Sequence, residues 1–305
     1  AGKAPEKRPV MLWIHGGSFT RGAGSIPLYD GTALARKGVV VVTINYRLGA
    51  FGYLAHPELT AESPHHASGN YGTTDQIQAL KWVQHNIAAF GGDPDNVTIF
   101  GESAGAFSVV QLLATPLTKV LFHRAIAQSG GGFFPLRGLD KPLLGVASAE
   151  EMGIKLAEAG KADSLRALRQ LSAEDVLSAA ATAGFYASLS VNLDGWVFPE
   201  QIHTVFAQGR QHKVPVMAGF NQDEFSAMAG MIAPLPKEAG AYAQEVRRRY
   251  GNRTEEYLTV YPSATMADSA YNAMRDGSLG WQMVNLVRAS AKHSTKAYLY
   301  YFSHP

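Results

Sequence analysis

The sequence predicts an α/β protein with a mostly parallel sheet, helices on both faces of that sheet and a helical insertion. Short apolar runs rich in β-branched residues each end in a glycine-containing turn, as buried parallel strands do. Helical patterns alternate with these runs over about the first 130 residues. Because parallel strands are joined by crossovers that are usually helices, this order indicates one open parallel sheet.

The expected elements of the first half follow in chain order. Each strand is an apolar β-branched run, and each helix carries apolar residues at helical spacing. Two consecutive glycines, Gly91 and Gly92, predict the end of the first helix. The elements are strands over Val10–Ile14, Val39–Tyr46, Val97–Phe100 and Arg124–Ser129, and helices over Thr74–Phe90 and from Ala104 to about Leu113.

The second half is predicted to be a helical insertion followed by a return to the sheet. Ser148 with Glu151, and Ser172 with Asp175, have the spacing of helix capping boxes. No stretch has the composition of a linker, so residues 1–305 are predicted to form a single domain. We expect helices from Ser148 to about Ala181 and over roughly Lys237–Ser294, strands over Val214–Phe220 and Ala297–Phe302, core segments at about 1–135, 190–235 and 275–305, and helical insertions at about 137–190 and 237–275.

The composition excludes several classes of protein. With 46% hydrophobic and 17% charged residues, the chain is core-forming and not disordered. A net charge of +2 argues against a nucleic-acid binder built on a basic face. The lack of cysteine excludes disulfides, thiolate metal sites and a cysteine nucleophile. No apolar run approaches the ~20 residues of a membrane span, and no signal-peptide pattern opens the sequence. The compartment, cytoplasmic or secreted, and the oligomeric state stay open.

The segment GESAG, with Ser103 at its centre, is a candidate site for a nucleophile. It follows the apolar strand VTIF and opens the helix AGAFSVVQLL. This strand–turn–helix setting is typical of a nucleophile elbow, in which flanking glycines permit a sharp turn that lifts the serine hydroxyl above the sheet. The alternative is an ordinary glycine-rich turn between a strand and a helix.

A second candidate element is the turn His15-Gly16-Gly17, directly after the strand MLWI. Two adjacent glycines allow backbone N–H groups to point into a site. Together with the N–H of Ala104, those of Gly16 and Gly17 are candidates to bind a developing oxyanion. The alternative is a tight turn with a capping histidine.

A serine nucleophile also requires a histidine base and an acid that orients it. In folds of this type the acid follows the serine in the chain and the histidine follows the acid. The strand Val214–Phe220 is followed by Asn-Gln-Asp-Glu, which places Asp223 or Glu224 at the carboxyl edge of the sheet. The pattern does not choose between these two residues.

The sequence resembles the type B carboxylesterase and cholinesterase-like family of α/β-hydrolases. The resemblance rests on WIHGGSF, NYRLGAFGYL, AIAQSG, LDGWVFP, GFNQDEF, AYLYYFSH and the long block GNYGTTDQIQALKWVQHNIAAFGGDPDNVTIFGESAG. It implies an α/β-hydrolase fold and a serine carboxylesterase that acts on a small-molecule ester without a metal or organic cofactor. The residues that match the family's site are the nucleophile Ser103, the acid Glu224, the oxyanion-hole residues Gly16, Gly17 and Ala104, and the supporting residues Glu102 and Ser129.

The catalytic histidine is the part of the pattern that does not fit. Only His293 and His304 follow Glu224. By chain order alone His304 is a candidate, but the family pattern places the base slightly later, beyond Pro305. The resemblance also implies further strands before Val10, so the sequence is expected to be the middle of a longer enzyme, truncated at both ends. We expect the strand over Val39–Ile44 to be an exposed edge and these residues alone to be aggregation-prone.

Two other functions stay open at this point. Cholinesterase-like folds also serve as non-catalytic binding modules, and an inactive truncated homologue would lack only the histidine. A protein that only binds has no reason to keep Ser103, the two glycines and Glu224 together. The aromatic residues near the site segments are candidates for an apolar substrate pocket, and they are Phe19, Trp196, Phe198, Phe220 and Phe225.

Overall fold

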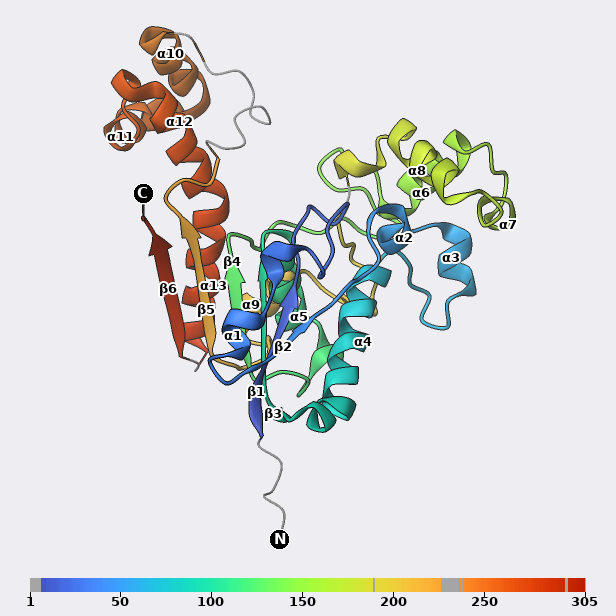
Figure 1. Ribbon diagram of the computed structural model, residues 1–305. Coiled ribbons are helices and arrows are strands. Elements are labelled where there is room, and N and C mark those ends of the chain that lie inside the picture. Colours follow the sequence, from blue (N-terminus) through green and yellow to red (C-terminus); the bar gives the residue numbers. More distant parts are fainter. Residues whose placement is uncertain (1–6, 189, 226–235, 237, 294–295, 305) are drawn as a thin grey trace.

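A computed structural model describes residues 7–188, 190–225, 236, 238–293 and 296–304 (Figure 1). A six-stranded sheet lies at its centre, in the order β2-β1-β3-β4-β5-β6. Each strand pairs in parallel with its neighbour, so the predicted parallel sheet is confirmed. The strands are β1 (Arg8–Ile14), β2 (Val40–Thr43), β3 (Gly92–Glu102), β4 (Arg124–Gln128), β5 (Val216–Asn221) and β6 (Ala297–Phe302).

Helices cover this sheet and extend beyond it. Short 3₁₀ segments lie at Pro27–Tyr29, Ile87–Phe90, Pro116–Thr118, Phe185–Ser188, Gly251–Arg253 and Ser263–Thr265, and a π turn at Asp276–Gly280. The α-helices are α1 (Thr32–Ala35), α2 (Gly49–Tyr53), α3 (Pro57–Glu62), α4 (Tyr71–Asn86), α5 (Ala104–Ala114), α6 (Ala149–Ala159), α7 (Leu165–Leu168), α8 (Ala173–Thr182), α9 (Ile202–Ala207), α10 (Ala239–Tyr250), α11 (Thr254–Val260), α12 (Met266–Arg275) and α13 (Trp281–Lys292).

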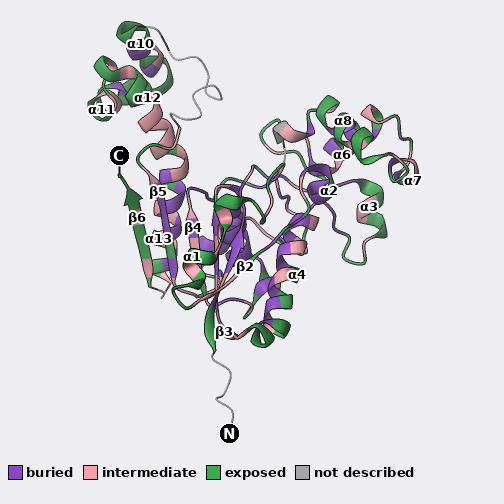
Figure 2. Ribbon diagram, viewed as in Figure 1, coloured by how far each residue is buried: buried purple, intermediate pink, exposed green. Residues whose placement is uncertain are grey.

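The core lies around β1, β3 and α5. Val10 and Leu12 of β1 pair with Val97 and Ile99 of β3, and none of these four side chains is exposed to solvent. Helix α5 packs on β1, β3 and β4 and is buried along almost its whole length. Figure 2 shows this central region as buried and the outer helices as mostly exposed. The segment that carries Ser103 is therefore fixed at both ends by the core.

The strand over Val39–Tyr46 is shorter than the sequence predicts. It ends at Thr43 because the next residues bond away from the sheet. The side-chain Oδ1 of Asn45 accepts a hydrogen bond from the backbone N–H of Gly24 (2.8 Å), and the Tyr46 hydroxyl donates to the carbonyl of His15 (2.8 Å). These contacts tie the second strand to the turn that follows β1.

Two helical lobes lie beyond the end of the sheet to which the strand arrows point (Figure 1). Helices α6 to α8 form one lobe with α2 and α3, and α10 to α12 form the other. The capping box at Ser148 is confirmed: its N–H donates to the Glu151 carboxylate (2.7 Å), and the Glu151 N–H donates to Ser148 Oγ (3.2 Å). At Ser172 only the second half forms, because the shorter Asp175 side chain bonds the Ser172 hydroxyl and not its N–H. The division of the chain into core and inserted segments stays a prediction.

The two edges of the sheet are β2 and β6. Strand β2 is thus the edge strand that the sequence predicts, whereas the expected tendency to aggregate stays a prediction. Strand β6 presents exposed apolar side chains, including Leu299 and Phe302. Within the described residues, the helices are too short or too polar to span a bilayer.

Candidate active site

Ser103 lies on the turn between β3 and α5. Its backbone has φ 53° and ψ −121°, a conformation that residues other than glycine rarely adopt. The Ser103 N–H donates to the carbonyl of Gln128 (2.9 Å), and the Ser103 carbonyl accepts from the N–H of Phe107 (2.9 Å). The strained turn is therefore held from β4 on one side and by α5 on the other, which is the geometry of a nucleophile elbow.

The glycines of the GESAG segment are required by close backbone contacts. A Cβ atom on Gly105 would lie 2.0 Å from the carbonyl oxygen of Ile14, and one on Gly101 would lie 2.6 Å from the backbone of Gly105. Any larger residue at either position would push α5 away from the ends of β1 and β3. The sharp turn and the helix can therefore form together only with glycine at both positions.

The turn after β1 lies directly against this elbow. A Cβ atom on Gly16 would lie 3.2 Å from Ser103 Cβ and 2.8 Å from the carbonyl oxygen of Glu102. Gly17 has φ +110°, and its carbonyl points back to accept bonds from the N–H groups of Thr20 and Arg21. Within the described part of the chain, the N–H groups of Gly16 and Gly17 donate no hydrogen bond. These donors, beside the N-terminal N–H of α5 at Ala104, suit an oxyanion.

Glu224 follows β5 and is held by two donors. Its Oε1 accepts from the Ser129 hydroxyl (2.5 Å) and from the backbone N–H of Asn221 (2.7 Å). Ser129 itself follows β4, and its N–H donates to the carbonyl of Gly219 (2.8 Å). Hydrogen bonds therefore connect the ends of β3, β4 and β5 at one edge, where Ser103 and Glu224 both lie. Asp223 is exposed and makes no such contact among the described residues.

Glu102 is a second carboxylate at this edge. Glu102 is partly open to solvent. Partial burial of its carboxyl group nevertheless raises its pKa, because burial disfavours the charged form. The negative charge of Glu224 raises that pKa further. The site thus brings two carboxylates close enough for the charge of one to affect the pKa of the other.

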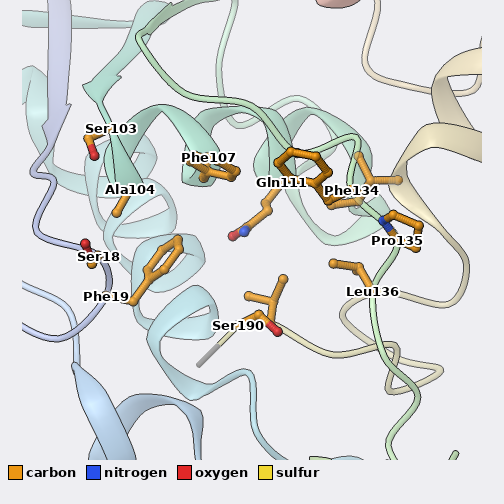
Figure 3. A pocket seen from close by; sticks show the side chains of 13 residues that line it. Ser18, Phe19, Ser103, Ala104, Phe107, Gln111, Phe134, Pro135, Leu136 and Ser190 are labelled. Atoms are coloured by element: carbon orange, nitrogen blue, oxygen red, sulfur yellow. The ribbon is translucent and has the colours of Figure 1, made fainter. Parts of the chain in front are cut away.

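A pocket of about 300 Å³ opens beside Ser103 (Figure 3). Its walls come from the turn after β1, from α5, from the loop after β4 and from the segment before α9. Most of the lining side chains are apolar or aromatic, as is usual for pockets that take small organic molecules. The lining residues are Ser18, Phe19, Ser103, Ala104, Phe107, Gln111, Gly132, Phe134, Pro135, Leu136, Ser190, Val191 and Ile202.

The sequence profile of the carboxylesterase family matches residues 2–305. The chain belongs to the carboxylesterase family. Its fold is that of the carboxylesterases, as expected: it superposes with a TM-score of 0.82 and 35% identity on a crystal structure of the carboxylesterase EST55 of Geobacillus stearothermophilus, covering 99% of this chain and 63% of that one.

Two curated esterases are similar over most of this chain. Fumonisin B1 esterase of Sphingopyxis macrogoltabida is 41% identical over 267 residues, which cover 85% of this chain and 47% of that protein. Para-nitrobenzyl esterase of Bacillus subtilis is 38% identical over 313 aligned residues, covering 97% of this chain and 60% of that protein. The chain therefore spans about half to three fifths of the length of these relatives.

The positions of the histidines in this chain indicate which of them could serve as the catalytic base for Ser103. Among the described residues, none that lines the Ser103 pocket is a histidine. His304 lines a different hollow, next to Gln222 and Asp223, and its ring stacks on Phe302 with centroids 6.3 Å apart. The ring of His293 packs against Gly209. A base beyond Pro305 stays a prediction.

Of the five aromatic residues predicted to line an apolar pocket, Phe19 lines the pocket beside Ser103 and the other four do not. Phe198 and Phe220 are buried in the core, and Trp196 stacks on the ring of His65 with centroids 3.9 Å apart. Phe225 is half-buried and lies outside the pocket lining. Phe107 and Gln111 were missed, although their spacing of three and seven residues from Ala104 places them on one face of α5. The loop after β4 gives no comparable signal in the sequence.

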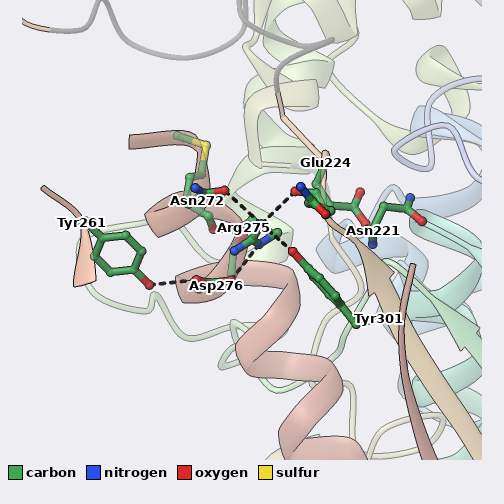
Figure 4. A network of polar contacts seen from close by, with 10 residues as sticks. Asn221, Glu224, Tyr261, Asn272, Arg275, Asp276 and Tyr301 are labelled. Carbon is green, nitrogen blue, oxygen red and sulfur yellow. Dashed lines mark hydrogen bonds and ion pairs between the residues drawn. The ribbon is translucent and has the colours of Figure 1, made fainter. Parts of the chain in front are cut away.

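The loop that carries Glu224 is anchored by Arg275 at the end of α12 (Figure 4). The Nη1 group of Arg275 donates to the carbonyl of Gln222 (2.8 Å) and lies 3.0 Å from the Tyr301 hydroxyl. Its Nε donates to Asp276 Oδ1 (2.7 Å), whose other oxygen accepts from the Tyr261 hydroxyl (2.9 Å). Arg275 is therefore in a position to fix the backbone two residues before the acid.

We expect Arg275→Met to lower kcat about 10-fold with little change in KM, because a displaced Glu224 no longer orients the base. A carboxylate beside a histidine raises the histidine pKa, so its displacement should also move the acid limb of the pH–kcat/KM profile to lower pH. Arg253→Met, which removes an exposed ion pair with Glu256 in α11, is the control. An equal loss in both variants, or an unmoved acid limb, would show that Arg275 has only a structural role.

Stability is expected to fall in acid because of His15. His15 is 1% exposed, its ring stacks on that of Tyr46, and burial lowers its pKa from an ordinary value near 6.5. The unfolded chain therefore binds a proton below about pH 6.5 while the folded chain does not, so stability declines as the pH falls toward the folded-state pKa. In thermal melts, His15→Phe should lose less Tm between pH 7 and pH 5 than the wild type. An equal loss in both proteins would exclude His15 as a cause.

Proposed function

We propose that this protein hydrolyses carboxylic esters of small molecules through an acyl-enzyme on Ser103. The family assignment and the similarity to curated esterases support the reaction class. The observation that carries the proposal is the strained Ser103 turn, packed against Gly16 and beside an apolar pocket. A protein that only binds ligands would not need a strained backbone at the residue that carries this hydroxyl group.

In the proposed first step, Ser103 Oγ bonds to the ester carbonyl carbon and its proton passes to a histidine base. The carbonyl oxygen becomes an oxyanion, which accepts hydrogen bonds from the N–H groups of Gly16, Gly17 and Ala104. When the tetrahedral intermediate collapses, the bond to the alkoxy oxygen breaks and the histidine returns the proton to the leaving alcohol. Water then repeats the sequence on the acyl-enzyme and releases the acid.

The role of Glu224 is to fix the tautomer of the histidine and to stabilise its charged form. Its Oε1 is occupied by Ser129 and Asn221, so Oε2 is the oxygen that we assign to the histidine ring. The placement of His304 in a hollow that Ser103 does not line supports a base other than His304. We expect His304→Asn to retain esterase activity, and a loss comparable to that of a triad residue would assign the base to His304.

Esterase activity is tested with the natural full-length protein. Para-nitrophenyl acetate and butyrate should be hydrolysed with saturation and with a burst of nitrophenolate equal to the active sites, because the acyl-enzyme accumulates when deacylation is slow. The para-nitroanilides of the same acids serve as the comparison for amide cleavage. A folded protein with no turnover of either ester would contradict the proposal and favour the non-catalytic alternative.

A further inference from the structure

Helix α5 carries a buried glutamine whose carboxamide lacks a partner. Gln111 is only 3% exposed, and its Oε1 accepts no hydrogen bond from the described residues. Buried side-chain polar groups are nearly always paired, because leaving one unpaired costs the full desolvation of the group. The neighbouring polar residue of α5 follows that rule, since the Ser108 hydroxyl bonds the Ala104 carbonyl (3.0 Å) and Gln76 (2.9 Å). Gln111 is thus the exception on this helix.

The carboxamide of Gln111 faces the Ser103 pocket. Ala104, Phe107 and Gln111 are spaced by three and four residues, so they lie on one face of α5, and all three line the pocket. In Figure 3 the Gln111 side chain extends from α5 into the hollow, toward Phe19 and Ser190. The carboxamide therefore borders the space that a substrate would occupy.

Apart from the hydroxyls of Ser18, Ser103 and Ser190, the side chains that line this pocket with Gln111 are apolar. The apolar part of the lining includes Phe19, Phe107, Phe134, Leu136 and Ile202. A substrate chain that is purely alkyl would bury the carboxamide without a partner. A chain that carries a carbonyl oxygen at the right depth would accept a hydrogen bond from Nε2 of the carboxamide, whereas Oε1 could accept only from a hydroxyl or another donor on the substrate.

We infer that Gln111 is a specificity-determining residue that selects esters with a hydrogen-bonding oxygen on the chain that enters this pocket. The inference rests on the proposed esterase function. The Cα atoms of Ala104 and Gln111 are about 10 Å apart along the helix, and helical side chains lean toward the N-terminus. The carboxamide thus lies on the order of 6–8 Å from the level of Ser103, which sets the oxygen several bonds from the ester carbonyl.

Shape-matched substrates test the inference with the natural full-length protein. Para-nitrophenyl levulinate and para-nitrophenyl isocaproate have equal numbers of heavy atoms and differ by a keto oxygen in place of a methyl group. Longer homologues of each ester vary the distance between the keto oxygen and the ester carbonyl. The acetates of a β-hydroxy ketone and of isoamyl alcohol place the same two groups on the alcohol side of the ester. We expect the keto ester of at least one pair to have a kcat/KM about 3- to 10-fold higher, the range of one neutral hydrogen bond.

Gln111→Met keeps the length of the side chain and removes the carboxamide. We expect it to bring the keto-to-alkyl ratio to about one and to raise kcat/KM for the alkyl ester. Its Tm should not fall, because an unpaired polar group is replaced. Gln111→Leu repeats the test with a second shape. Phe107→Leu, on the same face of α5, is the matched control, because it changes the size of the pocket and should change both esters of a pair in parallel.

The inference would be overturned if, for every substrate pair, the keto-to-alkyl ratio of kcat/KM were the same in the wild type as in both Gln111 variants. The esterase proposal would then remain intact. A ratio that falls as much in Phe107→Leu as in Gln111→Met would also overturn it, since size and not hydrogen bonding would then decide. A wild-type protein that hydrolyses none of the esters would overturn the proposed function and this inference together.

Discussion

Ser103→Ala is expected to lower kcat/KM for para-nitrophenyl esters by about 10⁴- to 10⁶-fold while the protein stays folded. The hydroxyl is the only atom lost, and the turn that carries it is fixed by the bond to Gln128 and by the close packing of Gly105 on Ile14. The remaining rate would come from the oxyanion donors and the pocket. The measurement is steady-state kinetics together with a thermal melt.

A second substitution at the same position separates chemistry from strain. Ser103→Gly also removes the nucleophile, but glycine adopts the positive φ of this turn without steric cost. We therefore expect Ser103→Gly to be as inactive as Ser103→Ala and more stable than it by about 1 kcal/mol. Activity in either variant within tenfold of the wild type would exclude Ser103 as the nucleophile.

Glu224→Gln is expected to lower kcat about 10³- to 10⁴-fold with little effect on KM, because the amide no longer stabilises the histidine cation or fixes its tautomer. The shape of the side chain is kept, so the contacts of Oε1 with Ser129 and Asn221 can be retained by the amide oxygen. Stopped-flow measurement of the nitrophenolate burst should locate the loss in acylation.

The neighbouring acid provides the control for this prediction. Asp223 has the same charge, is exposed and lies in the hollow beside His304. Asp223→Asn should leave kcat within about twofold, as surface substitutions away from a site usually do. A large loss in Asp223→Asn with a small loss in Glu224→Gln would reverse the assignment of the acid.

The sequence was sufficient to predict the parts of the fold that depend on local pattern. The strand β6 begins and ends where its apolar run does, and α5 begins directly after Ser103, because the GESAG turn fixes both neighbours. Local pattern also brought Ser103, Gly16 and Glu224 to one edge, since parallel strands place their carboxyl ends together. The end of β2 could not be predicted, because it depends on bonds from Asn45 and Tyr46 to residues distant in sequence.

The pocket was harder to predict than the reacting groups. Which aromatic residue faces a hollow depends on how separate elements pack, so Phe198 and Phe220 belong to the core while Phe134 comes from a loop without a motif. The anchoring of the Glu224 loop by Arg275 joins residues more than fifty positions apart in sequence and was not predicted either. Both features follow from tertiary contacts and not from any periodicity.

Whether Ser103 is the nucleophile is tested most directly by the mass of the protein after reaction with a fluorophosphonate, followed by peptide mapping. A serine nucleophile displaces fluoride and keeps the phosphonyl group on its oxygen. We expect one adduct per chain on Ser103, formed much more slowly in Glu224→Gln and absent in Ser103→Ala. An adduct on another residue, or a folded protein with no adduct, would contradict the assignment of Ser103 as an activated nucleophile.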